Sequence, residues 1–182
     1  NESMAYARLG ETQKSEASLQ KALKASPENA AANFNMGLLK AEQNDRKAAE
    51  KYLKAAFKQD PQMAQAAYNL CVITSKDRIN EAVSYCKKAA ELRPQEPRYA
   101  YTLAFYQQQK GESSAAVKTL EGLIEKQPAY ADSYLMLGAI YKRQGKRHEA
   151  EKVYNKALLV EGIPDQYKRR IAAQMEELQQ GS

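Results

Sequence analysis

A repeated spacing of prolines constrains the fold of this chain more than any other feature. Pro27, Pro61, Pro94 and Pro128 lie 34, 33 and 34 residues apart. Each follows a segment of helical character, such as KALKAS before Pro27 and KAAELR before Pro94, and a proline just after a helix prevents its continuation. A period of this length predicts helical units that stack on one another.

Small residues recur at fixed places within each period. Two antiparallel helices whose axes lie about 8 to 10 Å apart leave room only for small side chains where they cross. Each period therefore predicts a helix, a turn and a helix, and hairpins of this kind stack to bury a continuous core. The three columns are Gly37, Cys71, Ala104 and Gly138; Ala49, Ala82, Ala116 and Ala150; and Ala22, Ala56, Ala89 and Ala157, where Leu123 departs from the last.

The chain resembles the tetratricopeptide repeat family. The clearest copy is YLMLGAIYKRQGKRHEAEKVYNKAL, which has Gly138, Gly145 and Ala150 at the positions of the family pattern and Tyr134 in place of its tryptophan. The resemblance implies an all-α, right-handed superhelical solenoid of helix-turn-helix hairpins. We expect a single domain over residues 1–182, with a truncated repeat at 1–29, repeats at 30–62, 63–95, 96–129 and 130–162, and a capping helix at 164–180.

The last segment, DQYKRRIAAQMEELQQ, has apolar residues every three or four positions. This spacing predicts an amphipathic helix that closes the final hairpin. A basic helix lying on a membrane surface is the alternative, favoured by the cations at 168–170 and opposed by the acids at 176–177. The apolar residues are Tyr167, Ile171, Met175 and Leu178.

The two cysteines, Cys71 and Cys86, do not have the paired short spacing of a zinc site, and the lone His148 lies two repeats away. Cys71 is in the small-residue column of one helix, and Cys86 is in a column facing it. Facing Cα atoms in such a hairpin come within roughly 3.5 to 5.5 Å, which overlaps the disulfide range. We expect buried free thiols, with a disulfide as the alternative, so the compartment stays open between cytoplasm and periplasm; a disulfide favours the periplasm.

Enzyme chemistry and nucleic-acid binding find little support in the sequence. There is no GxSxG, no phosphate-binding glycine loop and no HExxH, and we expect no catalytic residue, cofactor or metal. The net charge of +6 is spread over both halves, which argues against a nucleic-acid face. No apolar run approaches the roughly 18 residues of a membrane span.

The resemblance implies that the first helix of each repeat lines a concave groove. Apolar residues spaced four apart there share one helical face and predict a stripe that holds a peptide or helix, although packing between repeats is the alternative interpretation. Asn1, Asn35 and Asn69 form a series at intervals of 34 that could hold a peptide backbone. The predicted groove residues are Phe34, Asn35, Leu38, Tyr68, Asn69, Val72, Arg98, Tyr101, Phe105 and Leu135.

These patterns predict a non-enzymatic scaffold that binds a protein or peptide segment. The alternative is a substrate-recruiting or spacer module of a larger enzyme, such as a glycosyltransferase or an extracytoplasmic multihaem protein. The chain begins without methionine inside an apparent helix, so we expect it to be part of a longer protein. Self-association through the aromatic groove is a further expectation.

Overall fold

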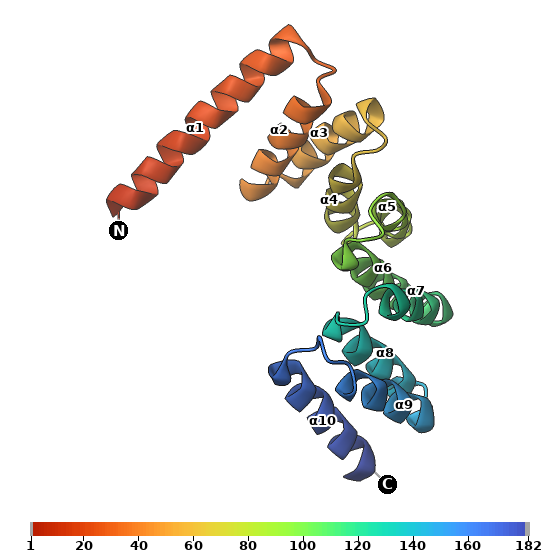
Figure 1. The fold of residues 1–182 in the computed structure, drawn as a ribbon. Coiled ribbons are helices and arrows are strands. Elements are labelled where there is room, and N and C mark those ends of the chain that lie inside the picture. Colours follow the sequence, from red (N-terminus) through yellow and green to blue (C-terminus); the bar gives the residue numbers. More distant parts are fainter. Residues whose placement is uncertain (1, 181–182) are drawn as a thin grey trace. The chain divides into compact units, whose positions relative to one another are not determined.

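The structure, a computed structural model, describes residues 2–180, with side chains from residue 10 onward, and this part of the chain holds helices and no strand (Figure 1). Two compact units divide it, Asn1–Leu92 with α1 to α5 and Arg93–Ser182 with α6 to α10. The all-α prediction is therefore confirmed. The helices are α1 Glu2–Ala25, α2 Ala30–Glu42, α3 Arg46–Gln59, α4 Ala64–Thr74, α5 Ile79–Leu92, α6 Pro97–Gln109, α7 Ser113–Lys126, α8 Ala131–Arg143, α9 Arg147–Leu158 and α10 Asp165–Gln180.

Short turns join the helices into hairpins, α2 with α3 and α4 with α5 in the first unit, α6 with α7 and α8 with α9 in the second. Three of these turns contain a residue with positive φ: Asn44 at 61°, Gly111 at 88° and Gly145 at 70°. Glycine adopts this left-handed conformation without a steric penalty, and asparagine tolerates it better than most residues. The turn between α4 and α5, residues 75–78, is one residue longer than the other three and has no residue with positive φ.

The first helix differs from the hairpins that follow it. Segment 1–29 was expected to contain the end of one helix and the whole of the next, yet α1 runs without a break from Glu2 to Ala25. Gly10 stands where Asn44 and Gly111 make turns, but it is helical here. A Cβ placed on Gly10 would meet nothing within 4 Å, so no described neighbour folds back over it to close a hairpin.

Close packing of a glycine against a large side chain holds the α2–α3 and α8–α9 hairpins together. A Cβ on Gly37 would lie 2.7 Å from Cγ of Leu53, and one on Gly138 would lie 2.2 Å from Cε1 of Tyr154. Both distances are shorter than any real carbon contact, so α2 and α8 approach their partner helices this closely only because they lack a side chain at these points.

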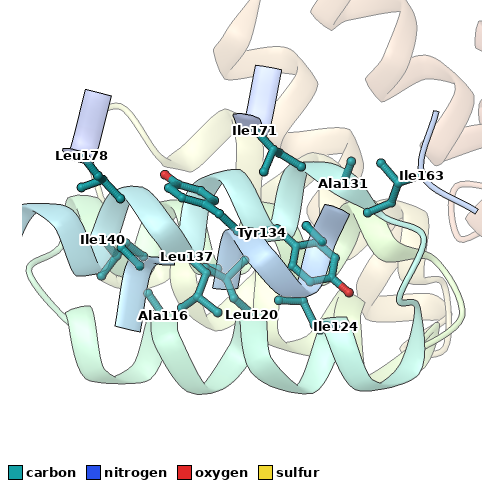
Figure 2. Close-up of a cluster of buried hydrophobic side chains, with 14 residues drawn as sticks. Ala116, Leu120, Ile124, Ala131, Tyr134, Leu137, Ile140, Ile163, Ile171 and Leu178 are labelled. Carbon is teal, nitrogen blue, oxygen red and sulfur yellow. The ribbon is translucent and has the colours of Figure 1, made fainter. Parts of the chain in front are cut away.

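The core of the second unit collects side chains from α7, α8 and α10 (Figure 2). Tyr134 and Leu137 of α8 face Leu120 of α7, and Ile171 and Leu178 of α10 cover them from the other side. Four residues at the predicted spacing along α10 thus face the core, two buried and two partly buried. The apolar side on which the membrane-surface alternative depends is occupied by this packing.

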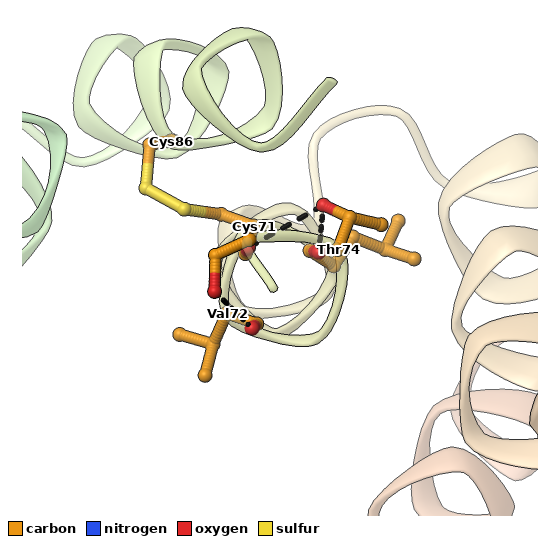
Figure 3. Close-up of a disulfide and its surroundings, with 6 residues drawn as sticks. Cys71, Val72, Thr74 and Cys86 are labelled. Atoms are coloured by element: carbon orange, nitrogen blue, oxygen red, sulfur yellow. Dashed lines mark hydrogen bonds between the residues drawn. A yellow bond between two sulfur atoms is a disulfide. The ribbon is translucent and has the colours of Figure 1, made fainter. Parts of the chain in front are cut away.

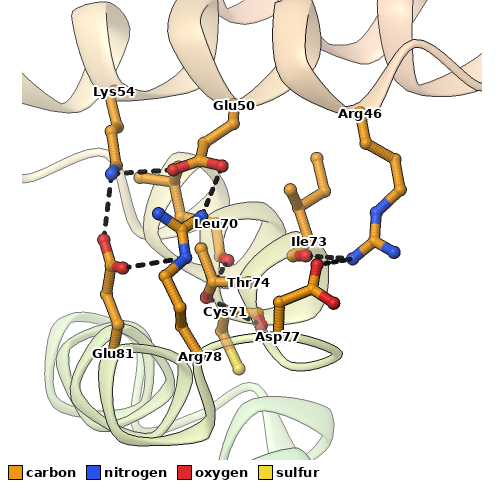
Figure 4. A network of polar contacts seen from close by, with 10 residues as sticks. All are labelled: Arg46, Glu50, Lys54, Leu70, Cys71, Ile73, Thr74, Asp77, Arg78 and Glu81. Carbon is orange, nitrogen blue, oxygen red and sulfur yellow. Dashed lines mark hydrogen bonds and ion pairs between the residues drawn. The ribbon is translucent and has the colours of Figure 1, made fainter.

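Charged residues connect the two hairpins of the first unit (Figure 4). The carboxylate of Glu50 on α3 forms ion pairs with Lys54 of the same helix, at 2.7 Å, and with Arg78 just before α5. Lys54 and Arg78 both reach Glu81 as well. Burial acts to raise the pKa of Glu50, but the hydrogen bonds from Lys54 and Arg78 outweigh it and hold that pKa below its usual value.

We expect Gly138→Ala and Gly122→Ala to change stability in opposite directions. The added methyl at 138 would overlap the ring of Tyr154 and cost about 1 to 3 kcal/mol. Gly122 lies inside α7 with nothing within 4 Å of a Cβ, so alanine there should stabilise by up to about 1 kcal/mol through helix propensity. Urea unfolding of both variants checks this, and a loss of stability confined to Gly122→Ala would contradict the packing.

The ion pairs of Glu50 should make stability depend on pH. Because its folded pKa is lowered, the stabilisation is fully present above the unfolded value of about 4.5 and is lost as the pH falls through the folded pKa. The difference in unfolding free energy between the unmodified chain and Glu50→Gln should therefore shrink on acidification. Glu42→Gln, at an exposed residue outside the network, is the control; identical pH profiles for both variants would contradict the assignment.

Candidate functional site

A cleft of about 430 Å³ lies in the second unit, between α6, α8 and α10. It includes three of the residues that the sequence predicts for a groove, Tyr101, Phe105 and Leu135, and the structure therefore brings these together. The spacing of four along α6 puts Tyr101 and Phe105 on one face of that helix. The lining residues are Tyr101, Phe105, Gln108 and Gln109 of α6, Asp132, Leu135, Met136 and Arg143 of α8, and Arg170 of α10.

The apolar part of the cleft is partly exposed to solvent. Phe105 is 41% exposed, although its ring packs edge-on against Tyr106 with centroids 5.2 Å apart. Tyr101 is partly buried and makes a similar contact with Tyr130 at 5.8 Å. Large exposed apolar side chains gathered at a concave site are typical of surfaces that bind a partner.

Polar groups surround this apolar part. Burial raises the pKa of the Tyr101 hydroxyl, Asp132 raises it further, and the charge of Arg170 acts in the opposite direction. The hydroxyl is therefore protonated at neutral pH and can donate a hydrogen bond. The Oε1 atom of Gln108 is buried and accepts no hydrogen bond. Arg143 and Arg170 form no ion pair with any side chain that the structure describes.

The other predicted groove residues lie outside this cleft. On α2, Phe34 and Leu38 are partly buried and Asn35 is exposed. On α4, Val72 is 41% exposed, and the residues Tyr68 and Asn69 are partly buried. The amide of Asn69 donates to the backbone oxygen of Gln65 in its own helix at 2.8 Å.

Two further predicted residues, Arg98 and Asn1, are not among the described residues that line the cleft. Arg98, at the start of α6, is exposed, with its guanidinium 5.8 Å from the ring centroid of Tyr99, and it does not line the cleft. Asn1, the first member of the asparagine series, lies outside the described residues.

A second cleft, of about 460 Å³, lies in the first unit between α1 and α3. At its base the buried side chain of Asn33 donates to the backbone oxygens of Pro27 and Asn29, so its amide hydrogens are already used. None of the predicted groove residues borders this cleft. Its lining consists of Gln20, Leu23, Lys24, Pro27, Asn33, Lys51, Tyr52 and Ala55.

Cys71 and Cys86 are joined by a disulfide between α4 and α5 (Figure 3). Their Cα atoms are 5.1 Å apart and both residues are fully buried. The bond is the alternative to the free thiols that we expected from the sequence. It occupies the place where the other hairpins have a small residue facing a large one, and the next residue, Val72, points away from it (Figure 3).

Sequence reasoning missed several residues of the second-unit cleft. Asp132 and Arg143 lie at helical spacing from the predicted Leu135 along α8, so this signal was available in the sequence. Arg170 could not be found in this way, because its position depends on how α10 packs against the preceding hairpin. No pattern in the residues indicated that the Oε1 atom of Gln108 would be buried without a hydrogen-bond partner.

No helix among residues 2–180 is long and apolar enough to cross a membrane. The described side chains contain no group of three or more His, Cys, Asp or Glu residues that could hold a metal ion.

Comparison with known families matches this arrangement of helices. The family described as Tetratricopeptide Repeats-Sensor matches residues 78–177, which is more than half of the chain. A second tetratricopeptide repeat family matches residues 1–45 and 34–97. The chain belongs to the tetratricopeptide repeat family. The resemblance seen in the sequence is thus confirmed, and no curated protein matches the chain significantly.

Solved tetratricopeptide repeat structures share the fold. A crystal structure of MamA aligns with a TM-score of 0.75 and 24% identity over 92% of this chain and 94% of that one. YrrB, described as "a TPR protein with an unusual peptide-binding site", aligns with a TM-score of 0.74 and 19% identity over 94% and 86%. PilF of Pseudomonas aeruginosa aligns with a TM-score of 0.68 and 19% identity over 98% and 89%. At these identities the likeness concerns the fold.

The disulfide of this tetratricopeptide repeat chain should be measurable by thiol labelling and unfolding. Alkylation of the unfolded chain without reductant should add no label, and reduction should release two thiols. Because the bond closes a loop with a sequence separation of 15, reduction should cost about 3 kcal/mol of stability.

The control for this measurement is a variant with Cys71→Ala and Cys86→Leu, the pair found at Ala104 and Leu120 in the corresponding hairpin of the second unit. Its unfolding should not respond to reductant. Two labels on the unreduced, unmodified chain would show free thiols and remove the disulfide as a sign of an oxidising compartment.

Proposed function

We propose that this chain is a non-enzymatic binding scaffold that holds a segment of another protein in the cleft of its second unit. The observation that carries the proposal is the exposure of Phe105, 41%, in a concave site that also contains Tyr101 and Leu135. An apolar side chain that remains in water at such a site favours burial by a ligand.

The size and chemistry of the cleft support a peptide or helix as ligand. A volume of about 430 Å³ is sufficient for a few side chains of a docked segment but small for a folded domain. YrrB, which shares the fold, is described as having a peptide-binding site. Protein partners are also what the family membership indicates in general terms.

The exposed residues of α4 extend the proposal to the first unit. Val72 is the counterpart of Phe105 in the repeat, and it is exposed to the same extent, 41%. We propose that Val72 and Tyr68 of α4 form a second contact surface in the first unit, as Phe105 and Tyr101 of α6 do in the second. The two surfaces can be tested one at a time.

Phe105→Ser should weaken binding of peptides selected on the unmodified chain. Panning a phage library of random peptides supplies the ligands, and fluorescence anisotropy measures their affinity. Truncation of a central anchor commonly loses 2 kcal/mol or more, so we expect a decrease of about thirtyfold or greater. Circular dichroism should be unchanged, because Phe105 is not part of the buried core.

Leu159→Ser is the matched control. Leu159 is another large exposed apolar residue of the second unit, 84% exposed, and it does not line the cleft. Its replacement should leave binding intact. Selected peptides that bind Phe105→Ser as tightly as the unmodified chain would disprove the role of the cleft, and a parallel loss in Val72→Ser would assign the ligand to both units.

A further inference from the structure

We infer that the cleft of the second unit selects acidic ligands: its occupant is an amphipathic protein segment with an apolar anchor flanked by Asp or Glu side chains. The inference rests on the proposed function and specifies its ligand. Arg143 of α8 and Arg170 of α10 are the residues that would recognise the carboxylates.

Two cations near the cleft have ion-pair partners, whereas the two arginines that line it have none among the described side chains. Lys142 is bound to Glu177 at 3.0 Å, and Arg147 lies 3.5 Å from Glu151. Arg143 and Arg170 both line the cleft, and neither has an ion-pair partner among the described side chains. Their guanidinium groups are therefore available to a ligand, and bidentate bonds to carboxylates are the strongest interactions they can make.

The charge balance inside the cleft also favours an acidic ligand. Asp132 is the only carboxylate in the lining, against two arginines. Asp132 and Arg170 both line the cleft with Tyr101, and both charges act on its hydroxyl. A ligand carboxylate in the cleft gains from the charge of Arg143 and Arg170, whereas a basic group there would be repelled by them.

The buried Oε1 atom of Gln108 adds a requirement for a donor. An unsatisfied acceptor costs free energy, and a rotation of the Gln108 side chain that brings Oε1 to a hydrogen-bond donor of a bound ligand would remove that cost. A protein segment supplies such donors through its backbone or side-chain N–H groups. Anchor, carboxylates and donor together describe an amphipathic protein segment more closely than they describe an anionic polymer.

The test uses a dye-labelled peptide, amidated at its C-terminus, with a central Phe-Leu pair between two glutamates on each side. Matched peptides carry glutamine or lysine in place of glutamate. The Glu peptide should bind about tenfold or more tightly than the Gln peptide, because hydrogen bonds to charged groups are the stronger ones. This preference should decrease with added salt, and the Lys peptide should bind most weakly.

Variants of the chain assign the preference to the two arginines. The double substitution Arg143→Gln and Arg170→Gln should make the Glu and Gln peptides bind equally, with unchanged helicity. Arg169→Gln, which removes an exposed charge of α10 outside the cleft, should keep the preference. Equal binding of the Glu and Gln peptides to the unmodified chain, or a preference that survives the double substitution, would overturn the inference.

The outcomes separate this inference from the proposed function. If Phe105→Ser weakens both peptides but glutamate brings no advantage, the cleft binds peptides and only the acidic preference is wrong. If a single-stranded oligothymidine binds more tightly than the Glu peptide and is lost in the double variant, the aromatic and cationic lining serves a nucleic acid instead. That result would overturn both proposals.

Discussion

The structure depends on one contact in each hairpin, between a small residue on the first helix and a residue facing it on the second. This contact determines how closely the two helices pack. Gly37 meets Leu53, and Gly138 meets Tyr154, so closely that a methyl group could not be added to either glycine without displacing its neighbour. In the α4–α5 hairpin, a disulfide between Cys71 and Cys86 replaces this contact, and the two Cα atoms are 5.1 Å apart. Packing and disulfide are two ways of holding the helices close together.

This contact also decides which side chains remain outside. Successive residues of a helix point roughly 100° apart, so the residue after the small one turns away from the partner helix. Val72 follows Cys71 and Phe105 follows Ala104, and both are 41% exposed. The outward position of these two residues is thus a geometric consequence of the hairpin, and their apolar identity makes the exposed surface hydrophobic there.

The parts of the fold that could be predicted from the sequence are those set by local spacing. The columns of small residues predicted the hairpins, and the spacing of apolar residues predicted the core-facing side of α10, where Ile171 and Leu178 are buried. Features that depend on longer-range packing were beyond this reasoning. The position of Gly10 is a turn in the later repeats, yet Gly10 itself is helical in α1. Arg170 reaches the cleft only because α10 packs against the last hairpin. The columns alone could not choose between thiols and a disulfide, because one geometry accommodates both.

Buried polar atoms without hydrogen-bond partners occur both in the core of the second unit and in the lining of its cleft, and their consequences differ. The hydroxyls of Tyr134 and Tyr154 are buried and form no hydrogen bond, yet they lie in the core, where the rings fill space beside Leu137 and Gly138. No ligand can reach them, so their cost is a consequence of using a large ring to fill the hairpin. The Oε1 atom of Gln108 is also buried without a hydrogen bond, but its side chain lines an open cleft. There a rotation of the side chain would bring the oxygen to a donor of the proposed ligand, and a cost to the free chain would become a gain in affinity.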